Sequence, residues 1–389
     1  MVEFAAMIAG PMCTALLADQ GADVIKVEPP GGDRLRQIGT ARGGIPALFA
    51  TINRNKRSLA LDVRAPRGRE ALERLVAGAD VFLENYRPGV LERLGIGAEG
   101  LRRAHPELVT VSIRGFGEEG PYARRKVIDS VMQAVSGVAA SEADAGSGRP
   151  RLIQTTICDK ATALLAAQAI AAALFARERG GGGQHVRLNM LDASVAFLWP
   201  DGMQSHTYLL AEGERISTRS GALDLRPTRD GWIAISAFTQ VEFEATCRAF
   251  GRPDLLTDPR LAEPRARMEN LDHWGEILAS LTAGHTSAEL AALLDAEDVP
   301  WGIANSLEDL HRDPQIVAND TLVEIEHPVA GRARMPRPVA RFAGDAQPPL
   351  RPAPLLGQHS DEVLGEIGVS AAEVGELREL GIVGGARPG

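Results

Sequence analysis

The sequence predicts an α/β protein with a doubly wound parallel sheet in a large domain, followed by a smaller α+β domain. Two observations in the 389 residues carry this prediction. Short apolar segments of strand length alternate with helix-like segments through the first 200 residues, which is typical of a parallel sheet covered by helices. From about residue 201, a short strand and amphipathic helices joined by proline-containing loops replace this alternation.

The chain opens with a strand, a turn, a helix and a second strand. We place these at residues 2–8, Gly10-Pro11, residues 12–20 and residues 22–27. Two prolines followed by two glycines, at residues 29–32, then end this unit. Further strands are predicted at residues 58–63, 80–84 and 108–113, and an amphipathic helix at residues 66–77.

The segment GFGEEG at residues 115–120 matches the pattern GxGxxG of dinucleotide-binding proteins. Pro121 follows it instead of an apolar helix, and Glu118 and Glu119 would repel a pyrophosphate. We therefore expect a loop here. The four glycines at residues 180–183 follow a predicted helix end, where the helix dipole repels anions, so we expect a surface turn there as well.

Asp159 stands directly before the most helix-prone segment of the chain, residues 160–179. Two interpretations are open for this residue. It could be a helix N-cap, because a short acceptor side chain satisfies unpaired backbone donors at a helix start. It could also be a carboxylate that helix N–H groups hold and keep ionised for attack on a substrate.

The second domain begins with a polar turn and an alternating strand at residues 228–240. Amphipathic helices are predicted at residues 241–250, 274–283 and 287–296. The chain ends with two helices that start at Ser360 and Ser370, each with acidic residues in its first turn.

The composition excludes several classes of protein. A net charge of -9 argues against nucleic-acid binding, which needs a basic surplus. Three widely spaced cysteines, and eight histidines without HExxH or CxxC, indicate neither disulfides nor a metal site and fit a reducing, cytoplasmic compartment. No stretch reaches the roughly 20 apolar residues that span a bilayer, so no membrane partner is expected.

Basic residues cluster in loops that follow the predicted strands. Since a doubly wound sheet binds ligands at the carboxyl ends of its strands, these loops could converge on one crevice and bind a ligand with several phosphates. Each cluster alone is ordinarily a solvated surface charge. No GxSxG or Walker lysine loop accompanies them, so hydrolase and P-loop chemistry are unsupported. The clusters are Arg34/Arg36, Lys56/Arg57, Arg87/Arg93 and Arg124 to Lys126.

Five segments carry a family resemblance: AGPMCTALLADQGADVIKVEPPGGDRLR, NRNKRSLALDVRAPRGREALERLVAGADVFLENYRPGVLERLG, SIRGFGEEGP, the stretch from CDK through the long helix to RERGGGGQHVRLNMLDAS, and PAPLLGQHSDEVLGEIG. In this order they resemble the family III CoA-transferases, the CaiB/BaiF group. The resemblance implies a Rossmann-like large domain formed by residues 1–200 and 321–389, with a small domain at residues 201–320 between them. It also implies a homodimer of two interlocked ring-like subunits.

The resemblance places the family's nucleophilic aspartate at Asp159. It implies transfer of CoA from an acyl-CoA thioester to a small carboxylic acid, through an aspartyl mixed anhydride and an aspartyl-CoA thioester. Acyl-CoA is then a substrate, and neither a tightly bound cofactor nor a metal is expected. The implied CoA contacts are Ile8, Ala9, Leu61, Arg64, Asn85, Tyr86, Arg87, Arg93, Lys126 and Asp129.

Two alternatives stay open. The same fold hosts α-methylacyl-CoA racemases, which resemble this chain but carry a His-Asp pair where it has Ile128-Asp129, and an acidic residue where it has Thr239-Gln240. A racemase without that histidine would lack a second proton carrier, so we prefer the transferase. The other alternative is a CoA-binding protein without turnover. No glycine-rich loop of the oxalate-specific type is visible near residues 220–227, which disfavours formyl-CoA:oxalate specificity.

Overall fold

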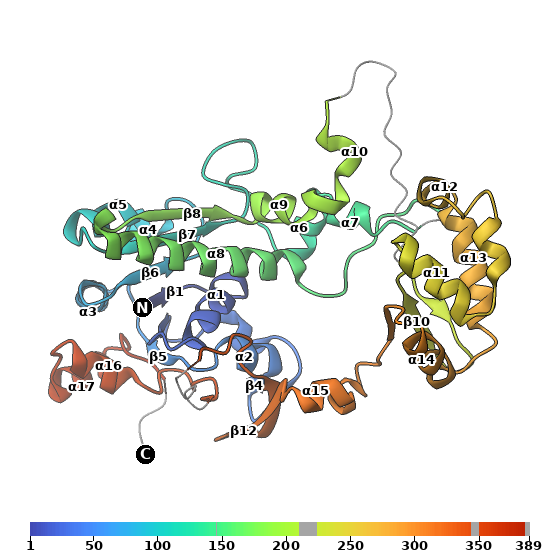
Figure 1. Cartoon of the computed structure of the whole chain (residues 1–389). Helices are drawn as coiled ribbons and strands as arrows, with labels where there is room; N and C mark the ends of the chain where they lie inside the picture. Colours follow the sequence, from blue (N-terminus) through green and yellow to red (C-terminus); the bar gives the residue numbers. More distant parts are fainter. Residues whose placement is uncertain (145, 210–223, 344–349, 386–389) are drawn as a thin grey trace. The chain divides into compact units, whose positions relative to one another are not determined.

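The computed structural model describes residues 1–144, 146–209, 224–343 and 350–385 (Figure 1). These residues form two compact units. Unit 1 combines Met1–Met203 with Asp320–Gly389, and unit 2 is Gln204–Asn319. Residues 220–223, in the segment where a glycine-rich loop was not expected, lie outside the described residues.

Unit 1 is built on a six-stranded sheet in which every neighbouring pair of strands is parallel. The predicted α/β fold with a large parallel sheet is therefore confirmed. The strand order is β5-β2-β1-β6-β7-β8, so the winding of the chain reverses between β1 and β6. Ligands bind doubly wound sheets beyond the carboxyl ends of the strands at such a reversal. The strands are β1 (Val2–Phe4), β2 (Ile25–Glu28), β5 (Arg57–Ala60), β6 (Val81–Glu84), β7 (Val109–Arg114) and β8 (His185–Asn189).

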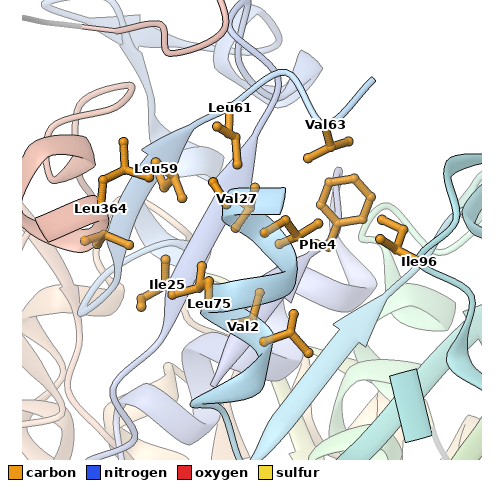
Figure 2. Close-up of a cluster of buried hydrophobic side chains, with 14 of the residues drawn as sticks. Val2, Phe4, Ile25, Val27, Leu59, Leu61, Val63, Leu75, Ile96 and Leu364 are labelled. Atoms are coloured by element: carbon orange, nitrogen blue, oxygen red, sulfur yellow. The ribbon is translucent and has the colours of Figure 1, made fainter. Parts of the chain in front are cut away.

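Helices cover both faces of this sheet, and the strands are therefore buried on both sides. On β6, Val81 and Leu83 pack in the same core cluster as residues of α1 and α8, whereas Phe82 belongs to the cluster on the other face. Figure 2 shows that second cluster, in which side chains of β1, β2 and β5 meet Leu75 and Leu364. The helices are α1 (Ala9–Ala18) and α8 (Ile157–Ala176) on one face, and α3 (Pro66–Ala77), α16 (Ser360–Glu366) and α17 (Ala371–Glu379) on the other.

The connection between β1 and α1 differs from the prediction. Strand β1 ends at Phe4 instead of residue 8, because the chain bends at Met7, whose φ is 67°. Helix α1 begins at Ala9, so Gly10 and Pro11 lie inside its first turn and not before it. Proline is tolerated there because N–H groups of the first turn have no partner within the helix.

Most residues of helix α8 are apolar. Within α8 and its extension, Ile157–Gly181, a window of 18 residues has a mean hydropathy of 1.4, and the helix is long enough to cross a membrane, so the expectation that no segment reaches this length was wrong. Length and composition alone do not distinguish a membrane span from a core helix. The inner face of α8 packs Ala163, Ala166 and Ile170 against the sheet, as a core helix does.

The C-terminal segment returns to the edge of the sheet at β5. Arg57 forms ion pairs with Glu362 and Glu366 of α16, and Leu61 bridges to Val383. The other elements of unit 1 are η1 (Arg34–Gln37), α2 (Ala47–Ile52), α4 (Val90–Leu94), α5 (Ala98–Ala104), α6 (Asp129–Val135), α7 (Val138–Ser141), η2 (Arg177–Gly181), α9 (Met190–Gly202) and two hairpins, β3 (Ala41–Arg42) with β4 (Ile45–Pro46) and β12 (Leu322–His327) with β13 (Gly331–Pro336).

Unit 2 combines a three-stranded antiparallel sheet with helices. Two of its helices begin at capping boxes, Thr239 with Glu242 and Thr286 with Glu289, and its core centres on Phe243. Its elements are α10 (Gln204–Thr207), β9 (Arg226–Pro227), β10 (Trp232–Ile235), α11 (Gln240–Ala249), η3 (Pro253–Thr257), α12 (Pro264–Glu269), α13 (Leu271–Thr282), α14 (Ser287–Ala296), β11 (Trp301–Ile303), η4 (Leu310–Arg312) and α15 (Pro314–Ala318).

Candidate active site

A cavity of about 830 Å³ opens at the carboxyl ends of β1, β6 and β7 in unit 1. It lies where the winding of the sheet reverses, which is the place where doubly wound folds bind ligands. The first turns of α1 and α8 reach it from one side. The cavity is lined by residues 6–9, 85–88, 113–115, 125–130 and 152–156, together with Arg34, Ile38, Ala123, Gln133, Asp159 and Met190.

Asp159 is the third residue of α8, and its half-buried side chain faces the cavity. It does not cap the helix. Asp129, the first residue of α6, takes that role: its Oδ1 accepts the backbone N–H of Cys158 at 2.8 Å and of Asp159 at 3.1 Å. The N-cap interpretation of Asp159 is therefore wrong, because a carboxylate 30 residues earlier in the chain satisfies the donors at this helix start.

Gln133 fixes Asp129 in place. Its side-chain amide donates to Asp129 Oδ2 at 2.7 Å and to the carbonyls of Ile153 and Thr155, while its oxygen accepts the N–H of Ile153. Both oxygens of Asp129 are thus engaged inside the protein, so its side chain positions α8, although Asp129 lines the cavity as a CoA contact would. The sequence analysis missed Gln133, whose only signal is its spacing of four residues from Asp129, which places both side chains on one face of a helix.

The pKa of Asp159 is raised to about 7. Burial is the largest cause, the negative charge of Asp129 adds to it, and a hydrogen bond from the backbone N–H of Ala9 acts in the opposite direction. No ion pair joins Asp159 to a lysine or arginine of the described residues. The expectation that Asp159 is fully ionised at neutral pH is therefore wrong, because the two helix N-termini do not outweigh burial beside a second carboxylate.

The basic clusters divide into two groups. Arg34, Arg87, Arg125 and Lys126 line the cavity, as expected for residues that meet phosphates. A second group does not reach it, because its members are engaged inside the protein. In this group Arg36 pairs with Glu28, Lys56 is buried against Glu3, and Arg57 pairs with Asp23, Glu362 and Glu366.

The residues predicted to contact CoA divide in the same way. Ile8, Ala9, Asn85, Tyr86, Arg87, Lys126 and Asp129 line the cavity. Three others do not line it. Leu61 lies in the hydrophobic core (Figure 2), Arg64 is exposed and paired with Asp62, and Arg93 is exposed on α4. Arg93 Nη1 lies beside Gly89, next to the cavity-lining Pro88, so its guanidinium is near the rim.

Comparison with known proteins identifies the family. The family described as CoA-transferase family III matches residues 1–360. The chain belongs to this family. It is therefore an enzyme that transfers CoA from an acyl-CoA to a carboxylate, as the family resemblance implied. Among the described residues, no group of histidine, cysteine and carboxylate side chains could hold a metal ion.

Curated relatives match over almost their whole length. The succinyl-CoA:glutarate CoA-transferase of Mus musculus is 33% identical, over 94% of this chain and 85% of its own. The succinyl-CoA–D-citramalate CoA-transferase of Chloroflexus aurantiacus is also 33% identical, over 94% of this chain and 92% of its own. The formyl-CoA:oxalate CoA-transferase of Afipia carboxidovorans is 34% identical, over 99% of this chain and 96% of its own.

Solved structures of other proteins share the fold of this chain. The crystal structure of Rv3272 from M. tuberculosis superposes with a TM-score of 0.80 at 31% identity, over 92% of this chain and 96% of the other. A CAIB/BAIF family protein from Brucella suis superposes with a TM-score of 0.79 at 31% identity, over 94% and 97% of the two chains.

Proposed function

We propose that Asp159 is the nucleophile of CoA transfer and that acyl-CoA binds in the 830 Å³ cavity. One observation carries the proposal. The carboxylate of Asp159 faces this cavity from the first turn of α8, with its pKa raised to about 7 and without a cation paired to it. A carboxylate that only stabilised the fold would be paired or hydrogen-bonded, and its pKa would be low.

The transfer takes four steps, and atoms and charge balance without any oxidant. Asp159 attacks the thioester carbonyl, so that a mixed anhydride forms and CoA thiolate leaves. The thiolate attacks the aspartyl carbonyl of the anhydride, which releases the donor acid and leaves an aspartyl-CoA thioester. The acceptor carboxylate attacks this thioester, forming a second anhydride. The thiolate then attacks the acyl carbonyl of that anhydride, and the new acyl-CoA and free Asp159 result.

The raised pKa of Asp159 favours these steps. Burial and the neighbouring Asp129 make the free carboxylate ion costly, and the anhydride and the thioester are both neutral at this position. The attack by Asp159 thus removes a destabilised charge. The carboxylate is also more basic than an ordinary aspartate, and nucleophilic strength rises with basicity.

The basic residues of the cavity supply the sites for the CoA phosphates in this proposal. Arg34, Arg87 and Lys126 have no ion-pair partner among the described residues and line the cavity. Guanidinium and ammonium groups bind phosphate through charge-assisted hydrogen bonds. Asp159 lines the same cavity as these cations, so a thioester whose phosphates they bind lies in the same cavity as the nucleophile.

We also propose that the chain forms a homodimer, interlocked as the family resemblance implies. Unit 1 leaves large apolar side chains exposed on two helices: Leu164 (53%) and Phe175 (68%) on α8, and Phe197 (56%) on α9. Gathered exposed apolar side chains are typical of protein interfaces. Light scattering on the purified protein tests this, and a monomeric mass would contradict it.

The function is tested with a panel of acyl-CoA donors and free acids. The relatives act on succinyl-CoA with glutarate or D-citramalate and on formyl-CoA with oxalate, so these pairs come first. We expect CoA exchange by mass spectrometry, an acyl or CoA adduct on Asp159, and loss of both in Asp159→Ala. The matched control is Asp192→Ala, which changes the exposed third residue of another helix, α9, outside the cavity.

An adduct that persists in Asp159→Ala would show that another group is the nucleophile. Exchange of the α-deuterium of a donor without any acceptor acid would point to racemisation instead of transfer.

A further inference from the structure

The segment that leads from β1 into the first turn of α1, residues 5–11, is held by side chains from other parts of unit 1. Four of its seven residues have a backbone group bound in this way, and these four flank Ile8 and Ala9, which line the cavity. Ala9 also donates its backbone N–H to Asp159. What holds this segment therefore determines where the first turn of α1 meets the nucleophile.

The first contacts come from Lys26 and Asp33. The Lys26 ammonium donates to the carbonyl of Ala5 at 3.1 Å and to Asp33 Oδ2 at 3.1 Å. Both oxygens of Asp33 in turn accept the N–H of Met7, at 3.2 and 3.3 Å. Lys26 and Asp33 are almost completely buried, so water does not weaken this pair.

Asn85 binds the residue between these contacts. Its side-chain oxygen accepts the N–H of Ala6 at 2.9 Å, and its amide donates to the carbonyl of Ala6 at 2.7 Å. Asn85 follows β6 and lines the cavity itself. The two strands on either side of the winding reversal are thus joined at the cavity floor.

The far end of the segment is held by Lys56. Its ammonium donates to the carbonyl of Pro11 at 2.7 Å and pairs with Glu3 at 2.8 Å. Glu3 also pairs with Lys26 at 2.8 Å and accepts the hydroxyl of Thr14 on α1. We call the buried ion pairs of Glu3, Lys26, Asp33 and Lys56 the ionic clamp.

Met7 shows that the clamp constrains the backbone. Its φ of 67° lies in the left-handed region, which an unbranched residue other than glycine or asparagine rarely adopts. Such a conformation persists only where its surroundings fix it, and it is found at functional sites. The N–H of Met7 is held by Asp33, and Ala9 follows two residues later.

We propose that the ionic clamp positions the first turn of α1 against Asp159, and that Asp33 is the positioning residue that holds Met7 in its left-handed conformation. The inference rests on the proposed role of Asp159 as the nucleophile. Asp33 touches neither the cavity nor the reacting atoms. It acts through the backbone of Met7 on the N–H of Ala9, whose hydrogen bond favours the ionised form of Asp159.

The test compares Asp33→Asn with Asp19→Asn. Asp19, like Asp33, is buried and forms an ion pair. Its partner is Arg54, and it lies at the opposite end of α1. Both substitutions remove a buried charge, so both lower the unfolding midpoint. We expect only Asp33→Asn to slow adduct formation, by about tenfold or more, because small displacements of a catalytic group have effects of that size.

A second readout does not depend on turnover. The pKa of Asp159 is followed by NMR titration of its ¹³C-labelled carboxyl, assigned by its absence in Asp159→Asn. Asp129 and Cys158 are the titratable groups that face it, and both are present in every variant. Asp33→Asn should raise this pKa above its wild-type value, since the neutral amide loses the ion pair with Lys26 and holds the Met7 N–H less firmly, and Asp19→Asn should leave it unchanged.

A third variant tests the role of Met7 itself. Glycine adopts the left-handed conformation without help from Asp33, so Met7→Gly combined with Asp33→Asn should recover part of the lost rate. The four proteins of this cycle give the coupling between the two residues. If the two changes act independently, the clamp does not work through Met7.

The outcomes separate the two proposals. Equal rates and an equal Asp159 pKa in Asp33→Asn and Asp19→Asn would overturn the clamp and leave the nucleophile untouched. If the wild type formed no adduct with any acyl-CoA, the proposed function would fail, and the titration of Asp159 would still decide whether the clamp sets its surroundings.

Discussion

Two regions of unit 1, the ionic clamp and the cavity, hold buried carboxylates whose pKa values are shifted in opposite directions. In the ionic clamp, burial acts to raise the pKa of Glu3, but Lys26 and Lys56 outweigh it and lower that pKa to about 2. At the cavity, burial and Asp129 together raise the pKa of Asp159 to about 7. The comparison teaches that burial alone does not set the pKa of a carboxylate: two cationic neighbours lower the pKa of Glu3, whereas an anionic neighbour adds to the rise at Asp159.

The pKa values of the two lysines of the clamp are shifted in opposite directions. The pKa of Lys56 is lowered to about 8, because burial outweighs its single carboxylate partner, Glu3, whereas Lys26 faces Glu3, Asp33 and Glu28 and its pKa is raised. Lys26 is thus the firmly charged centre of the clamp. Lys56 owes its charge to Glu3 alone.

The largest effect is expected when the clamp loses its central carboxylate. Glu3→Gln leaves Lys56 buried without a negative partner, and breaking a buried pair in this way costs about 3–5 kcal/mol of unfolding free energy. Urea unfolding measures it. Glu99→Gln, which changes an exposed glutamate paired with Arg103, is the control and should change stability by less than about 0.5 kcal/mol. Equal stability of the two variants would show that the clamp is not structural.

The second prediction concerns the pH dependence of stability, which has opposite signs in the two regions. Glu3 has a lowered pKa in the folded state, so its contribution is complete above its unfolded pKa of about 4.5 and is lost as the pH falls toward 2. Asp159 has a raised pKa, so the folded state binds its proton more tightly than the unfolded state, and stability falls as the pH rises from about 4 through 7.

Asp159→Asn should therefore stabilise the protein at pH 8 and have little effect at pH 4. The difference between 3.8 and about 7 sets a ceiling of roughly 4 kcal/mol at pH 8, at about 1.4 kcal/mol for each pH unit. Thermal unfolding at the two pH values measures it. A variant that is less stable than the wild type at pH 8 would mean that Asp159 is a stabilising carboxylate like Glu3.

The third prediction makes the surroundings of Asp159 less negative, and so closer to those of Glu3 in the ionic clamp. Asp129→Asn removes the negative charge beside Asp159 but keeps an oxygen for the N–H groups of Cys158 and Asp159. The pKa of Asp159 should fall, so the acid limb of the rate profile moves to lower pH, and a less basic nucleophile should react up to about tenfold more slowly at pH 8. Adduct formation between pH 5 and 9 measures both. A profile that does not move would assign the raised pKa to burial alone.

The sequence predicted the parallel sheet and the position of Asp159 because both depend on local patterns. Strand-length segments such as Val81–Glu84 alternate with helices, and a helix-prone segment follows the aspartate. The pairs that Glu3 makes in the clamp could not be predicted, since Lys26 and Lys56 lie 23 and 53 residues away in the chain. Outside the clamp, Arg57 meets Glu366 from 309 residues away. Lys56 and Arg57 therefore resembled phosphate ligands in the sequence, although both form ion pairs inside the fold.

The left-handed backbone of Met7 was missed for the same reason. Methionine carries no local signal for this conformation, and a strand to residue 8 was the natural expectation. Only Asp33 and Lys26, brought together by the fold, impose it. The pKa of Asp159 was misjudged likewise, because it depends on burial in the fold and on Asp129, which is 30 residues away in the chain.

The smallest effects are expected from the cations that remain free. Lys126→Ala, Arg87→Ala and Arg93→Ala should each weaken CoA binding about three- to tenfold, the effect of one partly screened phosphate contact. Arg177→Ala is the control, because Arg177 lies at the far end of α8 from Asp159, roughly 27 Å away at 1.5 Å per residue. Calorimetry at two salt concentrations measures the affinities, and added salt should narrow the differences, since it screens exposed charges. If only Arg93→Ala left the affinity for CoA unchanged, the CoA phosphates would be confined to the cavity. If all three variants left it unchanged, these free cations would not bind CoA, just as the paired cations of the clamp do not.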